Sequence, residues 1–130
     1  VMVWAALILV ATTIPLADTA LRTSIPWADK AVHLVLYLVL GGLVGAALSA
    51  GGHTSAGAWA AALLGLLVFA AMDEAHQLWL PHRVASVSDW IADAVGATVG
   101  LAAGMLLGTD IRPPGRVKER TGRHPDSHGG

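Results

Sequence analysis

The feature that most constrains this chain is a run of 42 residues, 31–72, without a formally charged side chain. A water-soluble helix of that length would need a polar face to solvate it. The 17 charged residues lie instead in two short clusters and a C-terminal tail, 109–130. The clusters are Asp18, Arg22, Asp29 and Lys30, and Asp73, Glu74, Arg83, Asp89 and Asp93. This distribution predicts an integral membrane protein and argues against a soluble enzyme, a disulfide-stapled secreted domain or a disordered chain.

Four segments are long and apolar enough to cross a bilayer, which needs roughly 20 helical residues and accepts about 17. They are residues 1–17, 31–50, 56–72 and 90–108. Between the second and third, Gly51-Gly52-His53-Thr54-Ser55 has the composition of a turn. We predict an all-α integral membrane four-helix bundle over residues 1–108, with a short disordered tail over 109–130. The first segment could instead be a cleaved signal peptide, although no basic residue precedes its apolar run.

Basic residues in the tail predict how the bundle is oriented. Positive charges that closely follow a span mark the cytoplasmic side of a membrane. Four spans then place both termini in the cytoplasm and both charged clusters on the extracytoplasmic face of the cell membrane. A tryptophan belt is predicted as well, with Trp4 and Trp59 near the inner interface. The basic residues of the tail are Arg112, Arg116, Lys118, Arg120 and Arg123.

Polar side chains of three predicted helices gather at the same end of the bundle. Residues three or four apart share a helix face, and ionisable groups within a span normally face the bundle interior. We therefore predict a single polar cluster near the outer membrane interface. Its members are Asp29, Lys30, His33 and Tyr37 from the second span, Asp73, Glu74 and Gln77 from the third, Arg83 from the following loop, and Ser86, Asp89 and Asp93 from the fourth.

The residue types in this cluster suit proton transfer and the binding of an anion. Asp29, one helical turn from His33, is placed to hold the imidazole as an acid–base group, and Arg83 can clamp a phosphate or a carboxylate. Structural roles stay open, such as Ser86 as an N-cap and Asp93 paired with Lys30 or Arg83 or sharing a proton with Asp89. The candidate catalytic residues are Asp29, His33, Asp73, Glu74 and Asp89, and the candidate substrate-binding residues are Lys30, Tyr37, Gln77, Arg83, Ser86 and Asp93.

We predict no cofactor and assign no metal ligand. A divalent metal ion is the alternative that the acids leave open, because two or three carboxylates with His33 suit such an ion. The chain has no cysteine, and none of the predicted spans carries a His-x-x-x-His spacing that would favour zinc.

Glycines recur every four residues in two of the predicted spans. Gly96, Gly100, Gly104 and Gly108 form a ridge in the fourth span, and Gly41 with Gly45 repeats the spacing in the second. Such ridges let helix backbones approach closely within a membrane. We expect close packing inside one chain, with a homodimer through these glycines as the alternative.

The polar residues also carry a resemblance to a known family. Asp29-Lys30-Ala31-Val32-His33 with Tyr37 resembles the Asp-Lys-x-x-His-x-x-x-Tyr signature of the VanZ-like family, small bacterial membrane proteins named for a teicoplanin-resistance component. Asp73-Glu74-Ala75-His76-Gln77, Pro81-His82-Arg83 and Ser86 with Asp89 are similar to its second signature. The resemblance covers roughly residues 17–108, with His82 where a glycine is usual and Asp93 where an asparagine is usual.

The resemblance implies a multi-pass cell-envelope protein connected with antibiotic resistance, but it implies no specific reaction. Two functions stay open. One is an enzyme or sensitivity factor that acts at the outer face on a lipid-linked cell-wall precursor and affects glycopeptide susceptibility. The other is a non-enzymatic binding or assembly protein whose polar cluster is structural. Membrane lipid is the expected partner, and nucleic acid is not, because no aromatic residues interleave the basic tail.

Overall fold

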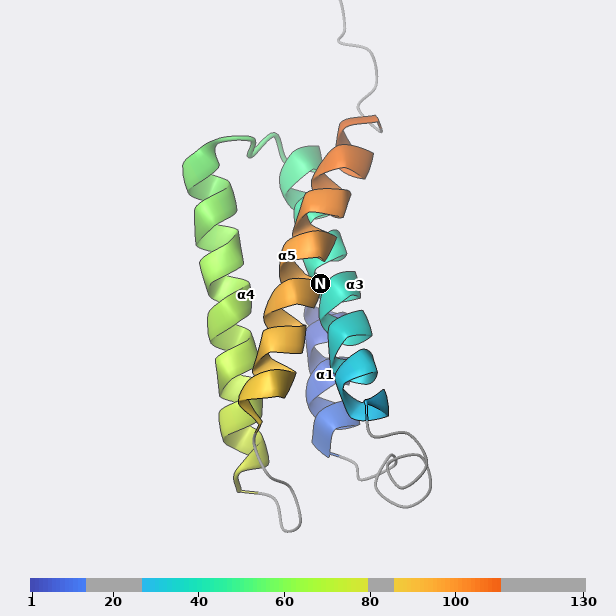
Figure 1. Cartoon of the computed structure of the whole chain (residues 1–130). Coiled ribbons are helices and arrows are strands. Elements are labelled where there is room, and N and C mark those ends of the chain that lie inside the picture. Colours follow the sequence, from blue (N-terminus) through green and yellow to red (C-terminus); the bar gives the residue numbers. More distant parts are fainter. Residues whose placement is uncertain (14–26, 80–85, 111–130) are drawn as a thin grey trace, which may run out of the picture.

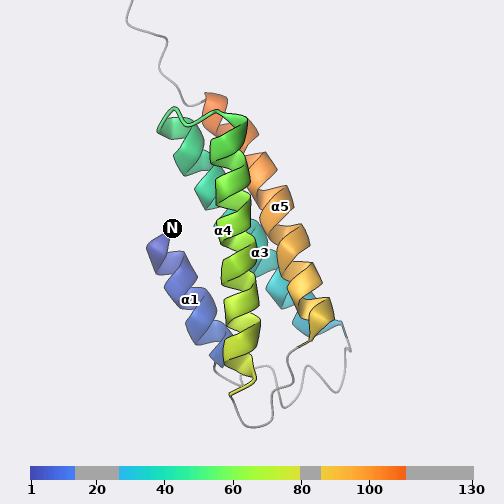
Figure 2. The same cartoon turned by 90° about the vertical axis from the view of Figure 1, so that its left-hand side faces the viewer.

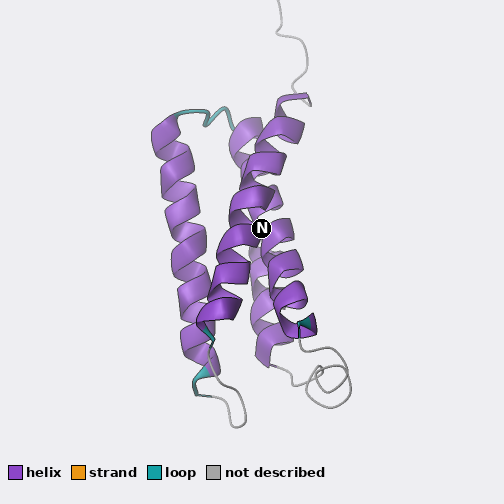
Figure 3. Cartoon of the chain, viewed as in Figure 1, coloured by secondary structure: helices purple, strands orange, loops and turns teal. Residues whose placement is uncertain are grey.

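The computed structural model describes residues 1–13, 27–79 and 86–110, with side chains as far as residue 108. These residues form four helices, α1 (Met2–Thr13), α3 (Ala28–Ala50), α4 (Ala56–Gln77) and α5 (Val87–Asp110), and no strand (Figures 1 and 3). The all-α prediction is confirmed for this part of the chain. The basic residues of the tail and the loop residues His82 and Arg83 lie outside the described residues, so their predicted roles stay predictions.

Three of the four predicted spans are present as long apolar helices. α3, α4 and α5 have 23, 22 and 24 residues, and each is apolar enough over its length to cross a membrane. At about 1.5 Å per residue they reach roughly 33–36 Å, which exceeds the roughly 30 Å of bilayer hydrocarbon. α1 is apolar but has 12 residues, about 18 Å of helix. The described part of the first predicted span is therefore shorter than a bilayer crossing.

The long helices extend past their apolar runs and include the polar residues. α3 begins three residues before the run predicted from residue 31, and α4 continues five residues beyond Met72. The turn between α3 and α4 is where its composition predicts, with Gly52 at a φ of 76° that favours glycine. Ser55 then caps α4, because its hydroxyl accepts a hydrogen bond from the Ala58 amide at 3.2 Å. The polar side chains consequently lie on regular helical turns rather than in loops.

α3 and α5 lie side by side and make the most extensive helix contact (Figures 1 and 2). A Cβ atom added at Gly96, Gly100 or Gly104 would overlap backbone atoms of α3. Gly41 and Gly45 are equally close to the α5 backbone. The predicted packing role of these glycines is confirmed within one chain. The predicted homodimer through these glycines stays a prediction.

The bundle exposes many large apolar side chains and buries several ionisable ones, unlike a soluble protein. Large apolar side chains point outward along all the helices, for example Leu64, Met72 and Leu106, which are 63%, 65% and 69% exposed. Ionisable and polar side chains are buried between the helices. The buried polar residues are Thr12, His33, Ser49, Asp73, Glu74, Gln77, Asp89 and Asp93. An apolar exterior around ionisable groups is the arrangement expected in lipid.

α1 packs beside only one half of the bundle. The chain begins level with the middle of α3, and α1 runs from there toward the end of α4 (Figure 2). The Trp4 indole N–H donates to the Leu36 carbonyl at 3.0 Å, near the middle of α3. Trp4 therefore lies beside the middle of α3, and its predicted place at the inner membrane interface stays a prediction.

Candidate functional site

One end of the bundle collects the polar ends of all four helices. The start of α3, the end of α4, the start of α5 and the end of α1 meet there (Figures 1 and 2). The turn over residues 51–55 and the C-terminal end of α5 lie at the opposite end. Three helix ends converge here as predicted, and the end of α1 is a fourth.

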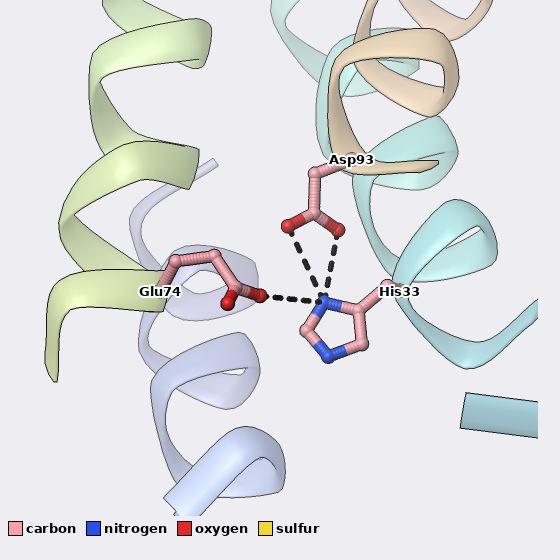
Figure 4. Close-up of side chains that lie close together, drawn as sticks. All are labelled: His33, Glu74 and Asp93. Atoms are coloured by element: carbon pink, nitrogen blue, oxygen red, sulfur yellow. Dashed lines mark hydrogen bonds and ion pairs between the residues drawn. The ribbon is translucent and has the colours of Figure 1, made fainter. Parts of the chain in front are cut away.

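A histidine between two carboxylates forms the centre of the site. His33 Nδ1 lies 3.0 Å and 3.3 Å from the two carboxylate oxygens of Asp93. Glu74 Oε1 approaches the same nitrogen from α4, at 3.9 Å. Figure 4 shows the three contacts meeting at Nδ1, with one residue from each of α3, α4 and α5. His33 is 2% exposed, Glu74 7% and Asp93 0%, so this triad is shielded from the surroundings.

A second buried carboxylate lies beside the triad. Asp73 is fully buried, and its Oδ1 accepts a hydrogen bond of 2.8 Å from the hydroxyl of Thr12 in α1. The Tyr37 ring packs against Phe69, with centroids 6.0 Å apart, and its hydroxyl is within electrostatic reach of Asp73. Neither that hydroxyl nor Asp73 Oδ2 has a hydrogen-bond partner among the described residues.

The rim of the site carries an ion pair. Lys30 Nζ lies 2.9 Å from Asp89 Oδ1, and the two side chains are 43% and 7% exposed. Ser86 borders the rim at the N-cap position of α5, where its carbonyl accepts the amides of Asp89 and Trp90. Its own amide donates to Glu74 Oε2 at 3.0 Å. This bond joins α5 to α4 and holds one of the two Glu74 oxygens.

The acids at the end of α4 are not a solvated helix terminus. Buried polar atoms in proteins almost always have a hydrogen-bond partner, and at the C-terminal end of a helix negative charge also opposes the helix dipole. Yet Glu74 Oε1 has no hydrogen-bond partner in the described part of the chain, and neither has Asp73 Oδ2. Burial of two adjacent acids without full hydrogen bonding costs folding free energy. This cost favours a functional role for Asp73 and Glu74 in addition to packing.

The structure corrects two predicted pairings. Sequence spacing assigns Asp29 to hold the imidazole, whereas the carboxylate at His33 Nδ1 comes from Asp93 on another helix. Of the partners predicted for Asp93, Lys30 pairs with Asp89 instead, and Arg83 lies outside the described residues. The reason is that partners across helices depend on how the helices are rotated, which same-helix spacing does not define. Asp29 lies half-buried in the first turn of α3.

The remaining predicted residues divide by position. Tyr37 and Gln77 are buried at the site, Ser86 is half-buried at its edge, and Arg83 lies outside the described residues. Thr12 was missed by the sequence analysis. It carries no charge and lies in an apolar segment, and the only signal for it is a hydroxyl pair, Thr12-Thr13, in that segment.

The triad offers the kind of donor set that holds a metal ion. One imidazole nitrogen of His33 and one carboxylate oxygen each of Glu74 and Asp93 lie within 4.8 Å of one another. All three residues are buried. A divalent ion at His33 with carboxylates is an alternative that the sequence leaves open, but spacing does not predict this combination because Glu74 and Asp93 are far apart in the chain.

An apolar cavity opens next to the triad. It lies between the end of α4 and the start of α5 and has a volume of about 340 Å³, within the usual range for ligand sites. Its lining is Ala71, Glu74, Ala75, Leu78, Ser86, Val87 and Trp90. The cavity therefore presents hydrocarbon walls with one acid and one hydroxyl at the polar end.

These features define a class of protein, a small helical bundle with an apolar exterior, three candidate membrane spans and a buried ionisable site at one end. The sequence model of the VanZ/LLP1 family matches residues 2–108, and the chain belongs to this family. The match includes α1, which supplies Thr12 to the site. No curated protein and no solved structure matches the chain.

Proposed function

We propose that this protein acts from within the membrane on the headgroup of a lipid-linked cell-envelope precursor, and that it thereby affects susceptibility to teicoplanin-type antibiotics. The observation that carries the proposal is the buried triad of His33, Glu74 and Asp93, in which Glu74 Oε1 has no hydrogen bond among the described residues, next to an apolar cavity. The connection with teicoplanin comes from the family, which takes its name from a teicoplanin-resistance component.

The triad supports proton transfer. The Asp93 carboxylate orients the imidazole through Nδ1, as a carboxylate does for a histidine that serves as an acid–base group. Glu74 faces the same nitrogen from the other side. A polar headgroup next to Glu74 would meet its carboxylate, so that a proton can move between a hydroxyl or phosphate of the ligand and Glu74, with the His33–Asp93 pair beside it.

The surroundings of the triad support a lipid as the ligand. The cavity walls, including Leu78 and Trp90, suit a hydrocarbon chain. The Lys30 side chain is 43% exposed at the rim, where a lysine ammonium group can bind phosphate. With the basic tail on the cytoplasmic side, the site would face the outer leaflet, where lipid-linked wall precursors are consumed.

Complementation in a glycopeptide-susceptible host tests the proposal. We expect the wild-type gene to change the inhibitory concentration of teicoplanin, and His33→Gln and Glu74→Gln to abolish the change at unchanged membrane abundance. His53→Gln is the matched control, because His53 is exposed in the turn at the opposite end of the bundle. If both site variants retain the wild-type effect, the site does not carry the function.

A second candidate function is a non-enzymatic binding or assembly protein in which the cluster locks the helices. The bonds from Thr12 to Asp73 and from Lys30 to Asp89 favour it, because each joins two helices. Under this alternative the site variants lower thermal stability and membrane abundance together. Measurement of both quantities alongside the teicoplanin phenotype separates the two functions.

A further inference from the structure

We propose that His33, Glu74 and Asp93 bind one divalent transition-metal ion of the zinc or manganese type, which ties α3, α4 and α5 together. The inference does not rest on the proposed function, because an ion can be bound whether or not the protein acts on a lipid. It rests on the geometry, the charge and the unmet contacts of the triad.

The geometry of the donor atoms suits one ion. Zinc binds histidine nitrogen and carboxylate oxygen at about 2.0–2.2 Å, so donors on the same ion lie roughly 3–3.5 Å apart. His33 Nδ1 is 3.0 Å from Asp93 Oδ1 and 3.9 Å from Glu74 Oε1, and the three donors lie within 4.8 Å of one another. Small side-chain adjustments therefore bring all three to coordination distance. Figure 4 shows that each donor points toward the space between the three helices.

The charge balance also favours a divalent cation. A neutral imidazole with the carboxylates of Glu74 and Asp93 carries two negative charges, which a divalent ion cancels. Lys30 does not fulfil this role, because its ammonium group is paired with Asp89 at the rim. In a bilayer-embedded site a neutral assembly is far cheaper than uncompensated buried charge.

An unmet contact points to a missing ligand. Glu74 is 7% exposed, and its Oε1 faces His33 without a hydrogen-bond donor among the described residues. The other oxygen, Oε2, is fixed by the Ser86 amide, so the side chain is held with Oε1 directed at the centre of the triad. A metal ion at that centre would satisfy Oε1.

The donor set indicates which ions fit. Imidazole with carboxylates suits zinc, manganese and iron, whereas calcium and magnesium prefer an all-oxygen shell. Three protein ligands leave at least one coordination position open, as in catalytic rather than structural zinc sites. The open position would admit water or a ligand headgroup from the adjacent cavity.

The test is metal binding by the purified full-length chain in detergent, after chelator treatment and dialysis against Zn²⁺ or Mn²⁺ with elemental analysis. We expect one ion per chain for the wild type. His33→Gln, Glu74→Gln and Asp93→Asn should each weaken binding by at least about tenfold. Glu74→Gln keeps an oxygen that accepts the Ser86 amide, and Asp93→Asn keeps an oxygen that accepts a His33 N–H, so these two variants are expected to fold.

His53→Gln controls for binding at the exposed His53 in the turn and should bind like the wild type. Co²⁺ loading adds a second readout, because a nitrogen- and oxygen-ligated ion gives visible d–d absorption that His33→Gln should abolish. Less than one ion per wild-type chain would overturn the proposal. Stoichiometric binding that persists in His33→Gln and Glu74→Gln would also overturn it, since the ion would then lie elsewhere.

Discussion

Replacement of Thr12 by valine is the sharpest test of how the buried acids are held. The substitution keeps the shape of the side chain and removes the hydroxyl that donates to Asp73 Oδ1 at 2.8 Å. Asp73 is fully buried, and its Oδ2 already lacks a hydrogen-bond partner in the described residues. The variant therefore removes a hydrogen bond from an acid that has no access to solvent.

The magnitude follows from the environment of this bond. Interhelical hydrogen bonds in membrane bundles contribute about 0.6 kcal/mol on average and roughly 1.7 kcal/mol at most. We expect Thr12→Val to lower the free energy of unfolding by about 1–2 kcal/mol, a five- to thirtyfold change in the folding equilibrium.

The assay is equilibrium unfolding in mixed micelles, followed by helical circular dichroism. Thr13→Val is the matched control, because Thr13 is the next residue in α1 and its side chain is exposed. The control should change the free energy of unfolding by less than about 0.5 kcal/mol. Equal effects of the two substitutions would refute the conclusion that α1 is fastened to the site through Asp73.

Three further predictions concern packing, the rim and the cavity. Gly100→Leu should lower the free energy of unfolding by about 1–3 kcal/mol or more, because the new side chain would overlap the α3 backbone. Gly65→Ala is the control in the same unfolding assay and should be neutral or stabilising, because a Cβ atom at Gly65 meets no atom within 4 Å. Lys30→Met should lower the free energy of unfolding by about 1 kcal/mol, because it leaves Asp89 without its cation. Lys30→Arg keeps the positive charge and should lose much less of this free energy. Ala75→Trp should fill the apolar cavity and abolish the teicoplanin phenotype at unchanged thermal stability; an unaltered phenotype would show that the cavity does not take the ligand.

The long helices themselves were predictable because charged residues are confined to their ends and absent from most of their length. The run without charge over residues 31–72 requires two apolar helices, and Gly51-Gly52 supplies the turn that divides them. The polar ends also follow from helical spacing, since His33 and Tyr37 are one turn apart and both are buried. Regular repeats within one helix determine which of its faces is polar. That face was expected to point toward the bundle interior, because ionisable groups within a membrane span normally do so.

The partners across helices were not predictable from spacing. Asp93 meets His33 because α5 lies against α3 through its glycine ridge, and the depth and rotation of that contact are set by backbone overlap at positions such as Gly96. The residue spacing within a single helix does not determine how α5 is rotated relative to α3. Thr12 was missed for a related reason: its role depends on α1 lying beside α4, and nothing in the apolar sequence around it indicates that contact.

The most direct measurement of the central claim is mass spectrometry of lipid-linked envelope precursors in three strains. The first strain lacks the gene, the second carries the wild type, and the third carries Glu74→Gln at matched membrane abundance. Glu74→Gln preserves an acceptor for the Ser86 amide and removes the charge at the triad. We predict that the wild type alters the pool of a lipid-linked precursor and that Glu74→Gln reproduces the profile of the strain without the gene. A Glu74→Gln profile identical to that of the wild type would contradict the account.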